Sequence, residues 1–328
     1  MNQSEFEMTY KIMIQTPISD GIKSVLEARD DVAYEHFSNH AEENILQHIG
    51  NYDAAILGIA PFTRRIVEKA EKLKIVARVG VGYDAVDVPA LTDHGIPLAI
   101  AGIANSVTVA EHSLLFMLAL AKRTAQYDRE TRKGNWNIRF EQPAWDLAGR
   151  TVLILGFGRI GRRLVPRCVA MDMRVLVHDP YVVQDAIVTA GAEPVADWRA
   201  VLNDIDFLSV NCPKNAETDG MVGEAELAAM RDDAFVINTA RGGIIDEAAL
   251  DMALERNIIG GAAIDPFVVE PATPDNPLFR HENILVSPHS AGVTKESVFR
   301  MGAATAQNVV DCFDGKLDPA NVVNQEVL

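Results

Sequence analysis

Short apolar runs alternate with longer amphipathic stretches along most of this chain. In the first third, the amphipathic stretches at residues 20–29, 42–49 and 63–73 have the apolar spacing of surface helices. Alternation of such helices with apolar runs is typical of βαβ units, which build a parallel sheet. The predicted strands of this part are residues 11–16, 31–36, 54–58, 75–80 and 97–101.

The same alternation returns in the second half of the chain. The two halves share this architecture but no repeated sequence. We therefore predict the α/β fold class, with two doubly wound parallel-sheet domains. The predicted strands of the second half are residues 151–155, 174–178, 207–210, 234–239, 259–264 and 283–286.

Two helical segments indicate how these domains are connected. Residues 106–123 join the halves, and residues 114–120 are apolar on nearly every side, which predicts a helix buried between domains or subunits. A last helix at residues 294–313 follows the completed second domain and is predicted to return to the first one. The predicted arrangement is a discontinuous domain, residues 1–105 plus 290–328, with residues 106–289 inserted; two consecutive domains in simple order are the alternative.

A glycine-rich turn is the strongest chemical signal in the chain. It reads Gly156-x-Gly158-x-x-Gly161 between an apolar strand and a helix, and Asp179 ends the next apolar run. The first glycine permits a tight turn, the second lets a pyrophosphate approach the backbone, and the third lets the helix pack closely. The helix N-terminus attracts phosphates, and a carboxylate about 20 residues on accepts hydrogen bonds from a ribose. These features predict a dinucleotide-binding site.

Composition narrows the class of protein. With 328 residues, 48% of them hydrophobic and 23% charged, the chain is typical of a globular protein of two domains. Its net charge of −16 disfavours binding to nucleic acid or to an anionic membrane. The three cysteines are widely spaced, and neither they nor the histidines predict a disulfide framework or a metal site. The N-terminus lacks an apolar signal region, so we expect a cytoplasmic location.

Polar residues follow several predicted strands of the second domain. Asp179, Arg241, Asp265 and His289 each come directly after an apolar run, and Glu270 follows Asp265 closely. The carboxyl ends of parallel strands meet at one edge of a sheet, where open α/β proteins bind their ligands. We therefore expect these side chains to converge on one rim.

Three of these residues have the chemistry that hydride transfer to a 2-keto acid needs. The planar guanidinium of Arg241 suits a substrate carboxylate and can polarise the carbonyl group. His289 can exchange the hydroxyl proton near neutral pH, and a carboxylate such as Glu270 would orient it and favour its protonated form. Plainer interpretations are a surface ion pair for Arg241 and turn capping for Asp265 and Glu270. We expect His112 and His178 to be structural.

The ordered motifs resemble those of a known family, the D-isomer-specific 2-hydroxyacid dehydrogenases, over almost the whole chain. The resemblance implies a discontinuous flavodoxin-like substrate domain, an inserted Rossmann NAD-binding domain, an NAD-dependent D-2-hydroxyacid dehydrogenase activity and a homodimer. It rests on Gly80-Val-Gly-Tyr-Asp-Ala-Val-Asp87, Val109-Ala-Glu-His112, Gly156-Phe-Gly-Arg-Ile-Gly161, His178-Asp-Pro180, Asn238-Thr-Ala-Arg-Gly-Gly243, Asp246-Glu-Ala-Ala-Leu250, Asp265-Pro-Phe-Val-Val-Glu-Pro271 and Ser287-Pro-His-Ser-Ala-Gly292.

The resemblance also implies roles for single residues. The catalytic residues would be Arg241, Glu270 and His289, acting on a small 2-hydroxy or 2-keto acid. Backbone amides around Val81 and Gly82, together with Arg241, would hold the substrate carboxylate, and residues 136–140 of a partner subunit would reach the substrate pocket. NAD would contact Gly156, Gly158, Arg159, Ile160, Gly161, Asp179, Cys212, Pro213, Thr218, Thr239, Ala240, Arg241, Asp265, His289 and Gly292.

The sequence departs at several positions from the motifs of related protein groups, and these differences narrow the activity that the resemblance implies. Glu270 stands where formate dehydrogenases of this superfamily use glutamine, so that branch is disfavoured. The loop at residues 57–62 lacks the arginine that many phosphoglycerate-type members place there. The C-terminal-binding-protein corepressors share the fold and the Arg/Glu/His set, but Ala291-Gly292-Val293 lacks their tryptophan. An NAD-sensing interaction module of that kind is the alternative to an enzyme.

Overall fold

The computed structural model of the protein describes residues 9–328. The chain divides into two compact units. Unit 1 comprises the chain up to Asn105 together with Val293–Leu328, and unit 2 comprises Ser106–Gly292. The chain therefore leaves unit 1 once and returns to it. The substrate-binding role expected for the first part and the dinucleotide-binding role expected for the second stay predictions, because the fold alone does not test them.

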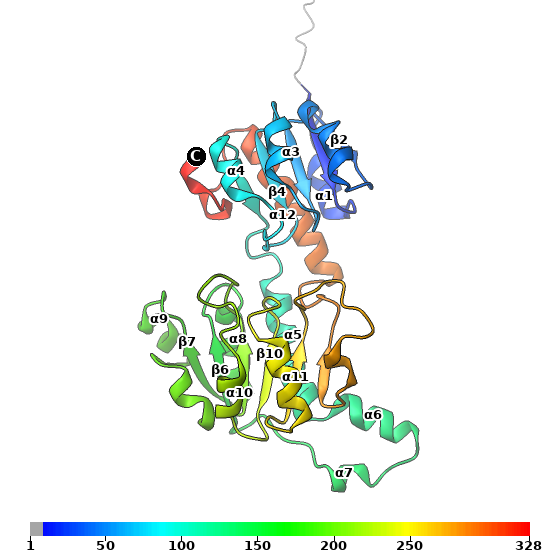
Figure 1. Ribbon diagram of the computed structural model, residues 1–328. Coiled ribbons are helices and arrows are strands. Elements are labelled where there is room, and N and C mark those ends of the chain that lie inside the picture. Colours follow the sequence, from blue (N-terminus) through cyan, green and yellow to red (C-terminus); the bar gives the residue numbers. More distant parts are fainter. Residues whose placement is uncertain (1–8) are drawn as a thin grey trace, which may run out of the picture. The chain divides into compact units, whose positions relative to one another are not determined.

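The described part of unit 1 is built on a five-stranded parallel sheet with the order β2-β1-β3-β4-β5 (Figure 1). This is the flavodoxin-like order, in which the direction of winding reverses between β1 and β3. The predicted fold class is confirmed for this unit, and every strand expected there is present. The strands are β1 (Tyr10–Gln15), β2 (Val32–His36), β3 (Ala54–Leu57), β4 (Ile75–Arg78) and β5 (Leu98–Ile100).

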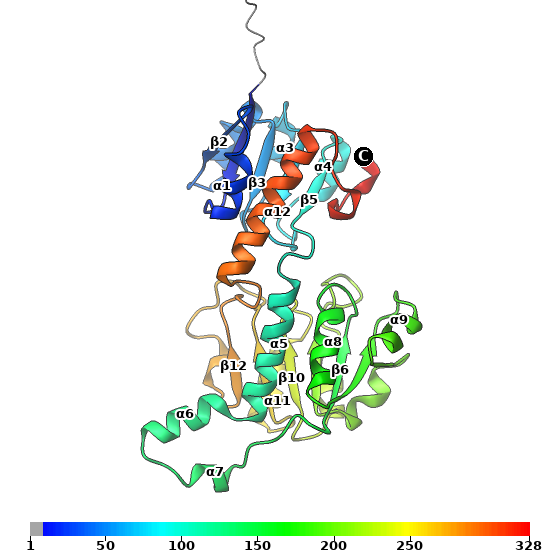
Figure 2. The same cartoon turned by 180° about the vertical axis from the view of Figure 1, so that it is seen from behind.

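Helices cover both faces of the unit 1 sheet, as Figures 1 and 2 show from opposite sides. Successive strand residues point to opposite faces, so Ile12 and Ile14 of β1 belong to one buried cluster and Met13 to the other. The first cluster contains residues of α1 (Asp20–Leu26) and α12 (Lys295–Phe313). The second contains residues of α2 (Glu42–Leu46), α3 (Arg64–Lys69) and α4 (Val88–Asp93).

The last helix, α12, is fixed to unit 1 by close backbone packing and by polar contacts. A Cβ atom at Gly21 of α1 would lie only 2.0 Å from the carbonyl oxygen of Phe299, so the two helices approach at a distance that only glycine permits. The buried amide of Asn308 donates a hydrogen bond of 2.9 Å to the carbonyl of Ile100 at the end of β5. Arg29 and Asp314 form an ion pair at 2.8 Å. The C-terminal segment is therefore an integral part of this unit.

Unit 2, which is described throughout, contains a seven-stranded parallel sheet with the order β12-β11-β10-β9-β6-β7-β8. Counted from β6, this is the Rossmann order with one further strand, so the fold-class prediction is confirmed here as well. The short strand β8 was not predicted, because Glu193 and Pro194 form no apolar run. The strands are β6 (Thr151–Leu155), β7 (Arg174–His178), β8 (Glu193–Pro194), β9 (Phe207–Val210), β10 (Phe235–Asn238), β11 (Gly261–Ile264) and β12 (Ile284–Val286).

Helices also cover both faces of this second sheet (Figures 1 and 2). Helix α5 buries Phe116, Met117 and Leu120 in the core of unit 2, whereas Leu115 is exposed. The apolar surface of α5 is thus only partly covered within unit 2. One face carries α5 (Ser106–Ala121), α8 (Gly161–Ala170) and α9 (Gln184–Thr189), and the other carries α10 (Glu224–Ala229) and α11 (Glu247–Glu255).

An arm follows α5 and extends from the body of unit 2; it consists of α6 (Thr124–Arg132) and α7 (Ile138–Glu141) with their connecting loop (Figure 1). Trp136 is 66% exposed and Phe140 is 74% exposed on this arm. The guanidinium of Arg139 lies 5.8 Å from the centre of the Trp136 ring and 4.8 Å from that of Phe140. Over residues 9–328, none of the helices combines the length and the apolar character that crossing a bilayer requires.

Candidate active site

The turn between β6 and α8 (the glycine turn, residues 156–161) depends on its glycines. Gly156 has a φ of +100°, a conformation that side chains rarely adopt. A Cβ atom at Gly161, where α8 begins, would lie 2.2 Å from the carbonyl oxygen of Gly156. The helix therefore packs against the turn as closely as the sequence pattern predicted.

The outer side of the glycine turn is open. A Cβ atom at Gly158 would meet no described atom of the chain within 4 Å. Ile160 is the N-cap residue of α8 and makes no side-chain cap hydrogen bond; the side chain of Arg159 is exposed beside it. A helix N-terminus without a side-chain cap, next to open space, suits a phosphate group. The residues predicted to hold a pyrophosphate therefore fit such a group.

Asp179 connects the end of β7 to this turn. One carboxylate oxygen accepts a hydrogen bond of 2.7 Å from the backbone N–H of Phe157, and the other accepts one of 2.9 Å from the N–H of Tyr181. The sequence predicted an acid at this position but gave no sign of the bond to the glycine turn. Asp179 is therefore fixed in place, and its remaining lone pairs can accept ribose hydroxyl groups.

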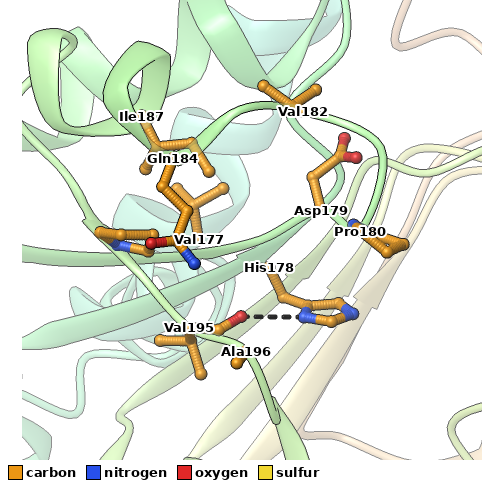
Figure 3. Close-up of a pocket in the computed structure, with 10 residues that line it drawn as sticks. Val177, His178, Asp179, Pro180, Val182, Gln184, Ile187, Val195 and Ala196 are labelled. Carbon is orange, nitrogen blue, oxygen red and sulfur yellow. Dashed lines mark hydrogen bonds between the residues drawn. The ribbon is translucent and has the colours of Figure 1, made fainter.

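A cavity of about 250 Å³ lies beside Asp179, between the end of β7 and α9 (Figure 3). Ile187 and Val195 contribute apolar walls, and Gln184 contributes an amide. The imidazole of His178 also lines the cavity, and its Nδ1 lies 2.9 Å from the carbonyl oxygen of Val195. This contact satisfies one ring nitrogen of His178, in keeping with the structural role expected for it.

The loop after β9 contains three residues for which cofactor contacts were predicted. Burial, with a smaller contribution from Asp179, raises the pKa of the Cys212 thiol to about 11, so this thiol is protonated and poorly reactive at neutral pH. The hydroxyl of Thr218 donates a hydrogen bond of 2.7 Å to the carbonyl of Pro213. These contacts shape the loop, and its part in binding a cofactor stays a prediction.

The residues after β10 are held by a side chain that was not predicted. Asn238 accepts a hydrogen bond of 3.0 Å from the N–H of Ala240 and donates one of 2.8 Å to the carbonyl of Arg241. The buried hydroxyl of Thr239 lies 2.7 Å from that of Ser113 on α5. The guanidinium of Arg241, which is half-buried, donates to the carbonyl of Ala240 at 2.7 Å. The backbone that carries Arg241 is therefore fixed on both sides.

Glu270 and His289 (the relay pair) are brought together as predicted. His289 Nδ1 lies 2.8 Å from Glu270 Oε2, while Glu270 Oε1 accepts a hydrogen bond of 2.9 Å from the N–H of Phe267. The side chains of His289 and Glu270 are 46% and 38% exposed, respectively. Because Nδ1 is bonded to the carboxylate, Nε2 is the atom left to exchange a proton with a ligand.

The turn that carries His289 is anchored by Asp265, which is buried. Asp265 Oδ1 accepts hydrogen bonds from the Ser287 hydroxyl at 2.5 Å and the Ser290 N–H at 2.7 Å, and Oδ2 accepts one from the Ala291 N–H at 3.0 Å. The N–H of His289 itself donates to the carbonyl of Asp265 at 3.1 Å. His289 has a φ of +50°, which is uncommon for a residue other than glycine, and this network holds it there.

His112 extends the network to α5. Its Nε2 lies 3.2 Å from the hydroxyl of Ser287, and its ring packs edge-on against Phe116 with centres 4.4 Å apart. Burial lowers the pKa of His112, and the nearby charge of Asp265 opposes this effect. His112 therefore fixes helix α5 to the turn that carries His289.

The remaining predicted residues lie elsewhere in the two units. Gly292 is half-buried at the end of unit 2, and Val81 and Gly82 are half-buried in the loop after β4 of unit 1. Their roles in binding stay predictions. Within residues 9–328, no group of three or more histidine, cysteine, aspartate or glutamate side chains is arranged to hold a metal ion.

Comparison with known proteins gives consistent matches over nearly all of the chain. Residues 114–291 match the profile of the D-isomer specific 2-hydroxyacid dehydrogenase family, NAD binding domain. A D-3-phosphoglycerate dehydrogenase of Archaeoglobus fulgidus is 33% identical over 96% of this chain and 59% of its own length. A glyoxylate reductase of Korarchaeum cryptofilum is 35% identical over 87% of this chain and 86% of its own. The crystal structure of D-lactate dehydrogenase from Aquifex aeolicus, complexed with NAD and lactic acid, has a TM-score of 0.85 at 25% identity and covers 96% of this chain and 99% of its own.

A Rossmann unit inserted into a flavodoxin-like unit is the architecture of a class of two-domain NAD-dependent dehydrogenases. The chain belongs to the D-isomer-specific 2-hydroxyacid dehydrogenase family. Residues 114–291 match its NAD-binding domain, and NAD is the cofactor of that domain. The chain spans about 59% of the length of the D-3-phosphoglycerate dehydrogenases of Archaeoglobus fulgidus and Methanocaldococcus jannaschii.

Proposed function

We propose that the protein interconverts a small D-2-hydroxy acid and its 2-keto acid, with NAD as the hydride carrier. The observation that carries this proposal is the 2.8 Å contact between His289 Nδ1 and Glu270 Oε2. A histidine bonded to a carboxylate through one nitrogen can exchange a proton through the other. Arg241 follows β10 in the same sheet and supplies a cation for the substrate carboxylate.

Each of these three side chains has a separate task in the reducing direction. Arg241 binds the carboxylate of the keto acid through its planar guanidinium and polarises the keto oxygen. When bound, NADH supplies the hydride for the keto carbon. His289 gives its Nε2 proton to the developing alkoxide, and Glu270 stabilises the imidazolium before that transfer. In the oxidising direction His289 takes the hydroxyl proton back.

We further propose that the substrate carries no phosphate group. The loop after β3, from Leu57 to Phe62, contains no lysine, arginine or histidine, and its Ile59 is 85% exposed. An exposed apolar side chain is suited to an apolar or small substituent, and a phosphate would require a cation. We assign this loop, together with the backbone around Val81 and Gly82, to substrate recognition by unit 1.

We propose a homodimer as the working assembly. The exposed Leu115 of α5 and the exposed rings of Trp136 and Phe140 on the arm form apolar surface on unit 2 that a second copy of the chain could cover. The guanidinium of Arg139 over both rings adds a cation–π contact that restricts the rotamers available to them. The partner's arm would then contribute to the substrate pocket.

A turnover screen tests the proposal. Purified protein is mixed with NADH and a panel of 2-keto acids: glyoxylate, hydroxypyruvate, pyruvate, branched keto acids and phosphohydroxypyruvate. We expect catalytic oxidation of NADH with at least one unphosphorylated acid and much slower oxidation with phosphohydroxypyruvate. Tight binding of NADH without turnover of any acid would contradict the enzyme and favour an NAD-sensing interaction module.

A further inference from the structure

The loop that carries Glu270 (the Glu270 loop, residues 265–271) is held by a second carboxylate. Glu247 is the first residue of α11, and its Oε1 accepts a hydrogen bond of 2.7 Å from the backbone N–H of Val268. The preceding N–H, that of Phe267, donates to Glu270 Oε1 at 2.9 Å. Two successive amides of one loop are thus bound by two different glutamates. One of these glutamates belongs to the relay pair.

The same loop is packed tightly against the residues that follow Arg241. A Cβ atom at Gly242 would lie 2.1 Å from the carbonyl oxygen of Phe267 and 2.5 Å from the nitrogen of Val268. The side chains of Val268 and Val269 are exposed, so apolar burial does little to hold this stretch of the loop. Phe267 is buried in the core of unit 2, and beyond it the loop is held by the close contact with Gly242 and by the hydrogen bond to Glu247.

The negative charge of Glu247 also acts on the relay pair. Burial raises the pKa of Glu247, the hydrogen bond from Val268 opposes this rise, and the charges of Glu270 and Asp246 add to it. Because the two carboxylates bind successive N–H groups of one loop, they are close enough to repel each other. A second carboxylate beside Glu270 makes the surroundings of His289 more negative. The other charged groups around this region include Arg241, which precedes Gly242, and Lys214 and Asp219, which both lie against Gly243.

We propose that Glu247 is a positioning residue of the proton relay, which fixes the Glu270 loop so that Glu270 stays directed at His289 and which favours the protonated imidazole through its own charge. This proposal rests on the proposed function in one respect, the assignment of His289 to proton transfer. Glu247 touches neither reacting atom: its hydrogen bond acts through the Glu270 loop, and its charge acts on the imidazole through space.

The test follows the protonation of His289 directly, so that it does not depend on turnover. The full-length protein is labelled with ¹⁵N-histidine, the His289 signals are assigned by their loss in His289→Gln, and their titration is recorded by NMR. Glu247→Gln keeps a hydrogen-bond acceptor for Val268 but removes the charge. We expect the midpoint of the His289 titration to fall by roughly half a pH unit in this variant, the size expected for a nearby, partly screened charge.

A matched control is Glu224→Gln. Glu224 is the first residue of α10, as Glu247 is the first residue of α11, and the side chain of Glu224 is exposed. The control should leave the His289 titration unchanged. A midpoint in Glu247→Gln equal to that of the wild type would overturn the proposal, since a merely structural glutamate would have no effect on it. If the wild type reduces no keto acid, the proposed function fails, but the titration still decides the role of Glu247.

Glu247→Ala removes the hydrogen bond as well as the charge. We expect kcat for keto-acid reduction to fall several-fold below that of Glu247→Gln, with little change in KM, because the displaced loop no longer keeps Glu270 directed at His289. Equal kcat in the two variants would show that the hydrogen bond does not position the loop and would overturn that part of the proposal.

Discussion

The hydroxyl of Ser287 donates a hydrogen bond of 2.5 Å to the carboxylate of Asp265, and this bond ties the end of β11 to the turn that presents His289. Asp265 is only 1% exposed, and it also accepts bonds from the N–H groups of Ser290 and Ala291. A buried carboxylate that accepts several hydrogen bonds strongly restricts the positions of the backbone segments that donate them. The position of the exposed His289 is therefore set by a residue that lies behind it.

Removal of the Asp265 carboxylate should destabilise unit 2 and displace this turn. Asp265→Ala leaves one buried donor and two partly buried donors without an acceptor, and we expect the free energy of unfolding to fall by about 2–4 kcal/mol. Urea denaturation followed by circular dichroism measures the loss. The exposed Asp232 offers a control, and Asp232→Asn should change little. Equal stability of Asp265→Ala and the wild type would show that the network does not hold the turn.

His112 should make the stability of the protein depend on pH. Burial lowers its pKa below the ordinary value of 6.5, so the unfolded chain binds the proton more readily. The stability that neutral His112 contributes is therefore complete above pH 6.5 and is lost as the pH falls through that value toward the lowered pKa. We expect Tm to fall less between pH 7 and pH 5 in His112→Gln than in the wild type. Identical changes in Tm would contradict this assignment.

The strands of both sheets could be predicted because a buried parallel strand is a continuous apolar run. The predicted range 151–155 coincides with β6, and 174–178 coincides with β7. The strand β8 was missed, because Glu193 and Pro194 pair with β7 without any apolar signal. The end of α12 at Phe313 was predicted, whereas the helices of the first third were predicted to end too late: α3 ends at Lys69, although the apolar spacing continues to residue 73.

The parts of the candidate site that lie in short sequence motifs could be predicted. Contacts between residues far apart in the sequence could not. The glycine turn and the relay pair follow from residue types and spacing. The contact between His112 and Ser287 joins residues 175 positions apart, and that between Glu247 and Val268 joins residues 21 positions apart. Such contacts depend on the packing of α5 and α11 against the sheet, and no local pattern reports them.

The coenzyme preference should favour NADH over NADPH. If Asp179 accepts the ribose hydroxyls as proposed, a 2′-phosphate would lie against its carboxylate, and two anions in contact at a partly desolvated site repel each other. Asp179→Asn keeps one acceptor oxygen, for the N–H of Phe157, loses the acceptor of the Tyr181 N–H and removes the charge. We expect kcat/KM for NADPH relative to NADH to rise at least about tenfold. The exposed Asp185 on α9 provides the control Asp185→Asn. Comparable wild-type kcat/KM values for the two coenzymes would contradict the preference.

The arm should contribute to dimerisation. Phe140→Asp places a charge on the exposed apolar surface proposed to be covered by a second copy, and it should raise the dissociation constant of the dimer at least about tenfold. Sedimentation velocity at micromolar concentrations measures the change. Val188 on α9 is also exposed, and Val188→Asp should leave the assembly unaltered. A wild-type protein that sediments as a monomer under these conditions would contradict the proposed homodimer.

The central claim is that His289 exchanges the substrate proton and that Glu270 supports it. The most direct test is kcat for keto-acid reduction as a function of pH in the wild type, His289→Ala and Glu270→Gln, with exposed His40→Ala as the control. In the reducing direction the rate should fall as rising pH removes the proton from His289, and Glu270→Gln should move this fall to lower pH. We predict that His289→Ala lowers kcat by roughly two to four orders of magnitude. Turnover by His289→Ala near the wild-type value, with an unchanged pH profile, would contradict the account.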